Sequence, residues 1–129
     1  MLVYRIEQAP QGPGPYDKYI QNDDQLMVAC ALLNKHNGSL KHPTPYLDGI
    51  RDFDGNDWLG SKGNDYCAFA SKAQLKQWFN GWFTKLHKAG FVLSVYDAQP
   101  VKMGGRQCAF DPRDAKHIKS VPVSKWRSA

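Results

Sequence analysis

The chain has 129 residues, of which 42% are hydrophobic and 22% charged, so its composition excludes general disorder. It has no apolar run of about 18 residues, and residues 1–5 lack the layout of a signal peptide. We therefore expect no membrane span and a cytoplasmic location. Cys30, Cys67 and Cys108 are odd in number and widely spaced, which favours free thiols over a disulfide framework.

The net charge of +5 is unevenly distributed along the chain. Residues 1–65 carry six Lys and Arg against nine Asp and Glu, a net charge of −3. Residues 66–129 carry eleven against three, a net charge of +8. This basic half predicts a positive face for an anionic partner such as a nucleotide, a nucleic acid or an acidic protein. A solvated surface that keeps the protein in solution is the alternative.

Two elements are predicted in the first part of the chain. Residues 2–7 alternate in polarity and predict a strand. Residues 8–16, with three Pro and two Gly, predict an irregular loop. Residues 22–37 predict a helix, because Asn22 suits the N-cap, acidic residues follow it in the first turn, and Gly38 comes after its end.

A long connection is predicted over residues 41–63, which are rich in Pro, Gly, Asp and Asn. Connections of this length in a compact domain are usually functional or mobile. Residues 52–56 read Asp-Phe-Asp-Gly-Asn, but Asp57 and Gly63 stand where a calcium loop needs Gly and Glu. Asx turns explain the acidic residues better, and the four His show no zinc spacing. The sequence therefore predicts no metal site.

The most strongly patterned stretch is residues 71–88, which predict a helix. Ser71 and Gln74 form a capping box, and Gly90 suits a left-handed C-cap. Asn80 and Gly81 lie in the middle, so we expect one continuous or slightly kinked helix, with two short helices as the alternative. The apolar positions recur at helical spacing, which predicts core packing: Leu75, Trp78, Phe79, Trp82, Phe83 and Leu86.

Short strands are predicted around and after this helix. They comprise residues 66–69, 91–96 and 106–110, the last two joined as a hairpin. Residues 113–118 predict a helical turn. Residues 121–129 predict a frayed basic tail, with an added edge strand as the alternative. Together the elements predict a single α+β domain, with two main helices packed on a mostly antiparallel sheet of four or five short strands.

One ligand site is predicted from basic and aromatic residues in separate segments. Arg forks bind phosphate, and aromatic rings stack on bases. The predicted ligand-binding residues are Arg5, Tyr16, His42, Tyr46, Arg106 and Gln107. The alternative is that the two Arg are exposed edge charges and the Tyr residues are core or rim. No nucleophile elbow or phosphate-binding Gly-rich loop is present, so we predict no catalytic residue and no cofactor.

Several motifs follow one another along most of the chain. They are Tyr4-Arg5-Ile6-Glu7, Gly14-Pro15-Tyr16, His42-Pro43-x-Pro45-x-x-Asp48, Phe69-x-Ser71-x-x-Gln74-Leu75-x-x-Trp78-Phe79, Gly90-Phe91 and Gln107-x-x-Phe110. This order resembles small bacteriophage and prophage accessory proteins. The resemblance implies a protein of the infected bacterial cytoplasm, of a kind that often counters host defence or modifies host machinery.

The strand layout also distantly resembles compact ADP-ribosyltransferases. That family has an Arg or His on an early strand, a Ser-bearing strand before a helix, and a late catalytic Glu. Arg5 and Ser71 match the first two positions. Glu7 is the only Glu of this chain, and residues 107–109 read Gln-Cys-Ala where the family has its late Glu. This departure weakens the implication of ribosyl transfer and leaves binding of an NAD-like ligand.

Three functions follow as hypotheses. The first is a non-enzymatic phage-type accessory protein that binds a host component, either a phosphorylated nucleotide signal or a defence protein, and so inhibits bacterial defence. The second is an ADP-ribosyltransferase-like enzyme that acts on NAD through Arg5. The third is a nucleic-acid-binding module that uses residues 66–129. We expect a binding protein rather than an enzyme.

Overall fold

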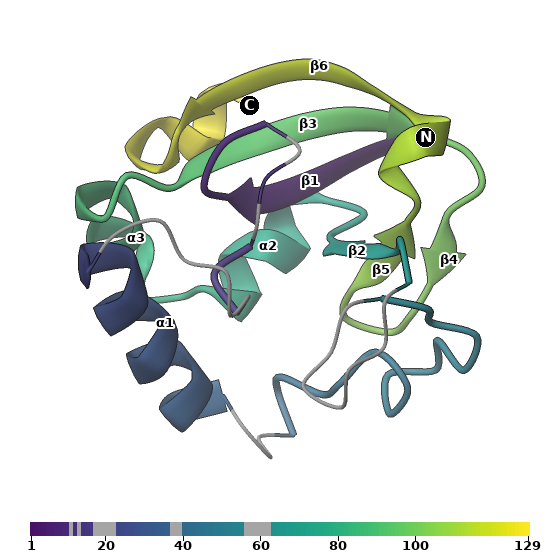
Figure 1. Ribbon diagram of the computed structural model, residues 1–129, viewed down its shortest axis with the longest axis horizontal. Coiled ribbons are helices and arrows are strands. Elements are labelled where there is room, and N and C mark those ends of the chain that lie inside the picture. Colours follow the sequence, from purple (N-terminus) through teal and green to yellow (C-terminus); the bar gives the residue numbers. More distant parts are fainter. Residues whose placement is uncertain (11, 13, 17–22, 37–39, 56–62) are drawn as a thin grey trace.

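Three antiparallel strands form one of two sheets in the structure, a computed structural model that describes residues 1–10, 12, 14–16, 23–36, 40–55 and 63–129. In sheet order they are β1 (Leu2–Glu7), β3 (Val92–Ala98) and β6 (Ala115–Pro122) (Figure 1). β3 lies between its two partners, and four consecutive residues from Leu93 to Tyr96 are buried. Continuous burial over four residues, including the β-branched Val95 and the aromatic Tyr96, suits a central strand that is covered on both faces.

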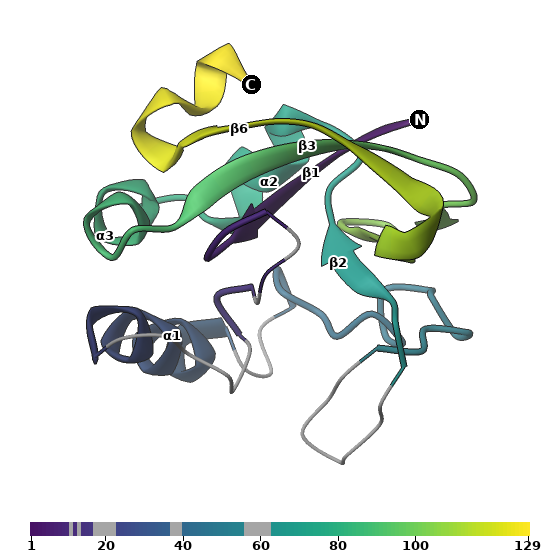
Figure 2. The same cartoon turned by 45° about the horizontal axis from the view of Figure 1, so that its top comes forward.

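The second sheet is smaller and is joined to the first. In sheet order its strands are β2 (Tyr66–Ala68), β5 (Cys108–Phe110) and β4 (Lys102–Met103). The residue after β2, Phe69, pairs with Tyr4 of β1 through two backbone hydrogen bonds of 2.8 Å. Because this bridge connects the edges of the two sheets, β2 lies beside β1 in both views of the ribbon (Figures 1 and 2).

The helices cover one face of the larger sheet. They are α1 (Asp23–His36), α2 (Lys72–Trp78) and α3 (Phe83–Lys88). One apolar cluster contains Leu75 of α2, Phe79 just after it and Leu86 of α3. These residues pack there with strand residues such as Leu93. α1 lies farther from the sheet than α3 (Figure 2). The predicted α+β class is confirmed. Within the described residues, no helix has the length and apolar character needed to span a bilayer.

The predicted helix over residues 71–88 is broken in two, as in the alternative interpretation. Gly81 has a φ of 83°, a left-handed conformation that ends α2 and redirects the chain into α3. The Ser71 half of the predicted capping box is present, because the Ser71 hydroxyl accepts the Gln74 N–H at 3.1 Å. The Gln74 side chain accepts the N–H of Ala70, one residue before the N-cap, at 3.2 Å. Gly90 has a φ of 89°, as its predicted C-cap role requires.

The segment after residue 110 differs from its prediction. The helical turn predicted over residues 113–118 is only a 3₁₀ helix, η1 (Pro112–Asp114), because the chain pairs with β3 from Ala115 onward. Residues 121–129, predicted as a frayed tail with an added edge strand as the alternative, begin with the last two residues of β6 and continue as a second 3₁₀ helix, η2 (Val123–Ser128). Val123 is fully buried, and the Trp126 ring stacks on Phe83 at 5.6 Å between centroids. Long-range packing thus orders residues that carry little local signal.

Some sequence predictions concern positions outside the described residues. These are the capping roles of Asn22 and Gly38 at the ends of α1, and the contribution of Asn56 and Asp57 to the acidic stretch. Among the residues that the structure does describe, no group of three or more His, Cys, Asp and Glu side chains is arranged to hold a metal ion.

Candidate functional site

Arg5, a predicted ligand-binding residue, is instead held inside the protein by its own neighbours. Its Nε donates to Glu7 Oε1 at 3.0 Å, Nη1 to the Cys67 carbonyl at 2.8 Å and Nη2 to the Gly12 carbonyl at 3.2 Å. The guanidinium also lies over the Tyr66 ring, 4.2 Å from its centroid. The Arg5 side chain is 9% exposed. The structure therefore places Arg5 in a clamp between β1, β2 and the loop that follows β1.

Tyr16 and His42, two other predicted site residues, meet in a cluster with His36 and Trp78. The Tyr16 hydroxyl is bonded to His36 Nδ1 and accepts a hydrogen bond from Trp78 Nε1 at 2.9 Å. His42 Nε2 donates to the Trp78 carbonyl at 2.8 Å. The two imidazole rings stack at 3.5 Å between centroids with an interplanar angle of 6°. This cluster fastens the segment beginning at residue 40 to the C-terminal ends of α1 and α2.

The electrostatics of this cluster favour neutral side chains. Burial and, to a smaller extent, the neighbouring His42 together lower the pKa of His36 to about 4. Burial raises the pKa of the Tyr16 hydroxyl well above its ordinary value. At neutral pH His36 is therefore an uncharged acceptor and Tyr16 an uncharged donor. A neutral, internally bonded pair of this kind fixes geometry rather than exchanging protons with a substrate.

A basic groove lies beside this cluster, and Arg106 of the predicted site lines it. The groove has a volume of about 540 Å³ and lies between α2, the start of the 40–48 segment and the turn between β4 and β5. Its lining consists of three cationic side chains, three amides and two apolar residues: Lys41, Lys76, Arg106, Gln74, Gln77, Asn80, Ala73 and Trp78. None of these described lining residues is acidic, so the groove suits an anion.

Asp48 positions Arg106 at the rim of this basic groove. The Asp48 carboxylate accepts the backbone N–H groups of Arg106 and Gln107, each at 2.9 Å, and its carbonyl accepts the Gly105 N–H at 3.0 Å. These bonds use the backbone of the turn and leave the Arg106 guanidinium on the exposed side. Asp48 therefore holds the turn that carries Arg106, a role that the sequence motif alone did not indicate.

Gln107 and Tyr46, the remaining predicted site residues, do not line the groove. Gln107 is 4% exposed, and its Nε2 donates to the Pro43 carbonyl at 2.8 Å. It therefore ties β5 to the segment that carries Lys41 and His42. Tyr46 is 56% exposed, and its ring faces the Arg51 guanidinium at 5.4 Å rather than the groove. Of the six predicted residues, the structure thus places Arg106 in the groove and Tyr16, His42 and Gln107 in its support.

The sequence prediction missed the part of the groove that α2 supplies. Ala73, Lys76, Gln77 and Asn80 follow the i, i+3, i+4, i+7 spacing of one helical face. That spacing was available as a signal, because these residues form the polar side opposite the apolar stripe. This face and Arg106 line the same groove because distant segments of the chain are in contact. A local sequence pattern cannot predict such a contact.

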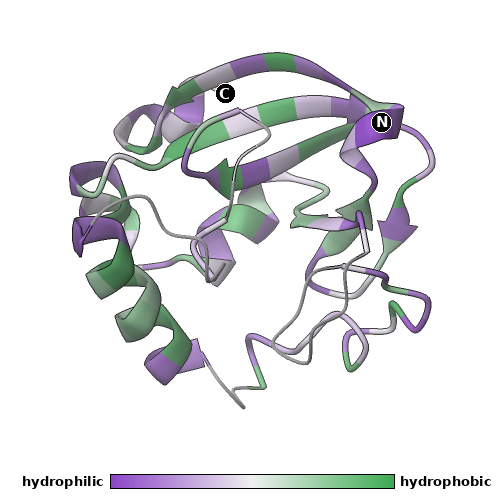
Figure 3. Ribbon diagram, in the orientation of Figure 1, coloured by the Kyte–Doolittle hydropathy of each residue, from purple (hydrophilic) through white to green (hydrophobic). Residues whose placement is uncertain are grey.

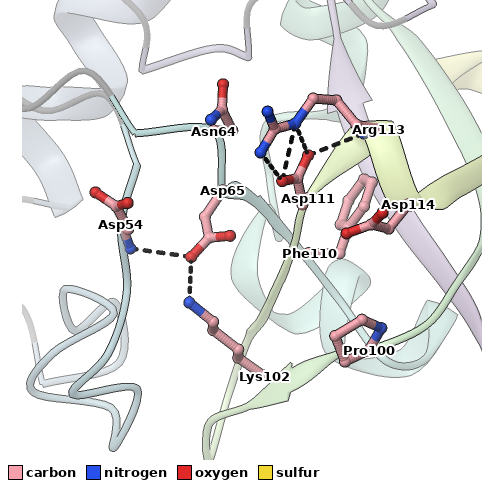
Figure 4. A pocket seen from close by; sticks show the side chains of 9 residues that line it. All are labelled: Asp54, Asn64, Asp65, Pro100, Lys102, Phe110, Asp111, Arg113 and Asp114. Atoms are coloured by element: carbon pink, nitrogen blue, oxygen red, sulfur yellow. Dashed lines mark hydrogen bonds and ion pairs between the residues drawn. The ribbon is translucent and has the colours of Figure 1, made fainter.

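A second, smaller pocket is occupied by its own ion pairs. It has a volume of about 270 Å³ and lies where β4 and β5 face residues 54 and 64–65 (Figure 4). Lys102 Nζ is 2.7 Å from Asp65 Oδ2, and Arg113 Nη2 is 2.6 Å from Asp111 Oδ2. In Figure 4 each cation points at its own carboxylate. Because both cations of this pocket are paired and its lining also carries Asp54 and Asp114, the basic groove is the better candidate for an anion site.

Comparisons with known proteins identify the family of this chain. Neither the curated proteins nor the solved structures gave a match. One family model, described as Bacteriophage T4 Y00F protein, matches residues 1–124. The match includes every residue that lines the basic groove, and it confirms the phage character that the motif order suggested. The chain therefore belongs to the Bacteriophage T4 Y00F protein family.

Proposed function

We propose that this phage-family protein binds a phosphorylated nucleotide of the host bacterium in the basic groove and performs no reaction on it. One observation carries the proposal: Lys41, Lys76 and Arg106 converge on one groove whose described lining contains no carboxylate. Phosphate oxygens are strong acceptors for both cation types, and the Arg fork can bind two of them at once.

The groove also offers groups for the rest of a nucleotide. The side-chain amides of Gln77 and Asn80 can each donate and accept, which suits the hydroxyls of a ribose and the edge of a base. The Gln74 amide is bonded within the protein, because its oxygen accepts the Ala70 N–H. Within the described part of the chain, no ion pair involves Lys76 or Arg106, and the Lys76 ammonium lies 5.4 Å from the centroid of the Trp126 ring. Neither charge is neutralised by a carboxylate in these residues.

The transferase alternative has weaker support. It assigns Arg5 to NAD, yet three nitrogens of that guanidinium are bonded to Glu7 and to two backbone carbonyls. Binding without transfer needs neither Arg5 nor a late Glu. In the proposal, sequestration of a nucleotide signal in the host cytoplasm inhibits bacterial defence, a use that agrees with membership of a bacteriophage family.

Calorimetric titration and thermal shift with defined probes test the proposal. The probes are pyrophosphate, ADP-ribose, a cyclic dinucleotide and a short DNA duplex. A probe present at about 100 times its dissociation constant adds roughly 2.7 kcal/mol to the free energy of unfolding, which raises the melting temperature by about 10 °C for a chain of this length. We expect a shift with at least one nucleotide.

A matched pair of variants locates the binding. The test variant Lys76→Gln/Arg106→Gln removes two groove charges, whereas Lys88→Gln/Lys116→Gln removes two exposed charges elsewhere. We expect the first to weaken nucleotide binding by about tenfold or more, which is ~1.4 kcal/mol, and the second to change it little. Equal losses, with a preference for DNA and a steep salt dependence, would favour the nucleic-acid alternative. Absence of any shift would exclude the proposal and direct attention to a protein target.

A further inference from the structure

The outward face of α1 is apolar, although it lies at the edge of the molecule. The helix buries Gln25, Ala29, Leu32 and His36 against the rest of the protein. On the opposite side Leu26 is 47% exposed and Met27 71% exposed, and both Cys30 and Ala31 are exposed. A solvated helix normally places polar residues on this side. These four residues form the exposed apolar side of α1.

The charges of α1 are segregated to its two ends. Asp23 and Asp24 lie in the first turn, and Lys35 lies in the last turn. Figure 3 shows the same arrangement, with an apolar middle between two hydrophilic ends. Such a helix is acidic at one end, basic at the other and apolar between them. A partner that is complementary to it must carry the reverse order of charges around another apolar stretch.

We propose that this partner is the α1 of a second copy of the chain, packed antiparallel across a twofold axis. An antiparallel copy places the Lys35 end of one helix beside the Asp24 end of the other, twice by symmetry. It also opposes the two helix dipoles, with positive and negative ends adjacent. A parallel arrangement would instead bring the acidic ends together. The order of charges along α1 therefore favours a second copy of the chain as the partner and an antiparallel arrangement of the two helices.

The twofold axis passes close to Cys30. This residue lies near the middle of the helix between Asp24 and Lys35 and is flanked by the small side chain of Ala31. The small residues allow close approach of the two helices, and the two Cys30 thiols face each other across the axis. One helix face buries less than the ~800 Å² per partner of a standard interface. We therefore expect reversible association, with a dissociation constant on the order of 10–100 µM.

Sedimentation velocity over a concentration series tests the association. The wild-type mass should rise from 14.6 kDa toward twice that value as concentration increases. Met27→Glu places a carboxylate in the apolar centre and should keep the protein monomeric at every concentration. The matched control is Leu47→Glu, because Leu47 is 76% exposed on another surface; it should associate like the wild type. Both changes are on the surface, and circular dichroism checks that both variants remain folded.

Two further measurements test the geometry. A short bismaleimide should link two copies through Cys30, the exposed thiol, and Cys30→Ser should abolish the product, since Cys108 is buried and Cys67 is less exposed than Cys30. Asp24→Lys and Lys35→Glu should each weaken association, and the double variant should restore it. A monomer at all concentrations overturns the proposal, as does a dimer that survives Met27→Glu and forms no Cys30 product. The groove variant Lys76→Gln/Arg106→Gln should leave the dimer intact, which separates this inference from the proposed function.

Discussion

The only glutamate of the chain is fully buried, and its surroundings explain why a single residue can link distant strands. Glu7 accepts from Arg5 Nε at 3.0 Å and from the Tyr96 hydroxyl at 2.7 Å. Arg5 in turn reaches the Cys67 carbonyl. The buried ion pair is thus held by β1, β2 and β3 together. An Arg on a strand also suits phosphate binding, so the sequence pattern predicted a ligand for Arg5. In the fold, Glu7 and backbone carbonyls bind the guanidinium instead.

Arg5→Ala should therefore act on stability rather than on binding. Removing the guanidinium leaves the Glu7 carboxylate buried without its cation, which typically costs about 3–5 kcal/mol of unfolding free energy. Urea denaturation measures the loss. The control Arg113→Ala breaks the pair with Asp111, in which the Arg113 side chain is 71% exposed, and should change the urea midpoint little. Similar losses in the two variants would contradict the structural role of Arg5.

His36 should make stability depend on pH in mildly acidic solution. Its pKa is about 4 in the folded protein against 6.5 in an exposed histidine, so the unfolded chain binds a proton first as the pH falls. The contribution of neutral His36 to stability is complete above about pH 6.5 and is lost progressively toward pH 4. We expect the urea midpoint to fall over this range and to fall less in His36→Gln. An equally steep decline in His36→Gln would contradict the assignment.

At the scale of elements, one backbone conformation separates α2 from α3. Gly81 has a φ of 83°, and a Cβ built there meets nothing within 4 Å. Position 81 therefore requires Gly for its backbone conformation and not for lack of space around a side chain. Gly81→Ala should cost about 1–2 kcal/mol of unfolding free energy. Gly81→Asn should cost less, since Asn adopts the left-handed region more readily. Denaturant unfolding of the two variants measures the difference, and an Ala variant as stable as the wild type would contradict it.

The elements that the sequence predicted well are those with strong local signals. The strand at residues 2–7, the capped start of α2 and the buried strand after Gly90 all follow from alternation, capping or β-branched runs. The break at Gly81 was only the alternative, because the apolar periodicity continues across it. The ordered end of the chain was missed, since residues 115–128 gain their structure from pairing with β3 and packing on Phe83.

At the scale of the whole molecule, the groove could be predicted only in part. Arg106 was selected by its chemistry, and His42 by its place in a long connection. Lys41, α2 and Arg106 come together because Asp48 and Gln107 tie the 40–48 segment to the turn between β4 and β5. Those ties join positions 59 and 64 residues apart. Local patterns cannot contain such pairings. Two of the three cations, Lys76 and Arg106, belong to the basic C-terminal half of the chain.

The pairing of β1 with β3 has a consequence for how the protein is made. Leu2 pairs with Asp97 and Glu7 with Val92, so the first strand has no neighbour in the larger sheet until β3 has been synthesised. At ~5–20 residues per second, that wait is on the order of 5–20 s on the ribosome. During it, the apolar side chains of β1 and the Arg5–Glu7 pair must stay solvated or engage a chaperone. The larger sheet therefore cannot form until its central strand, β3, has been synthesised.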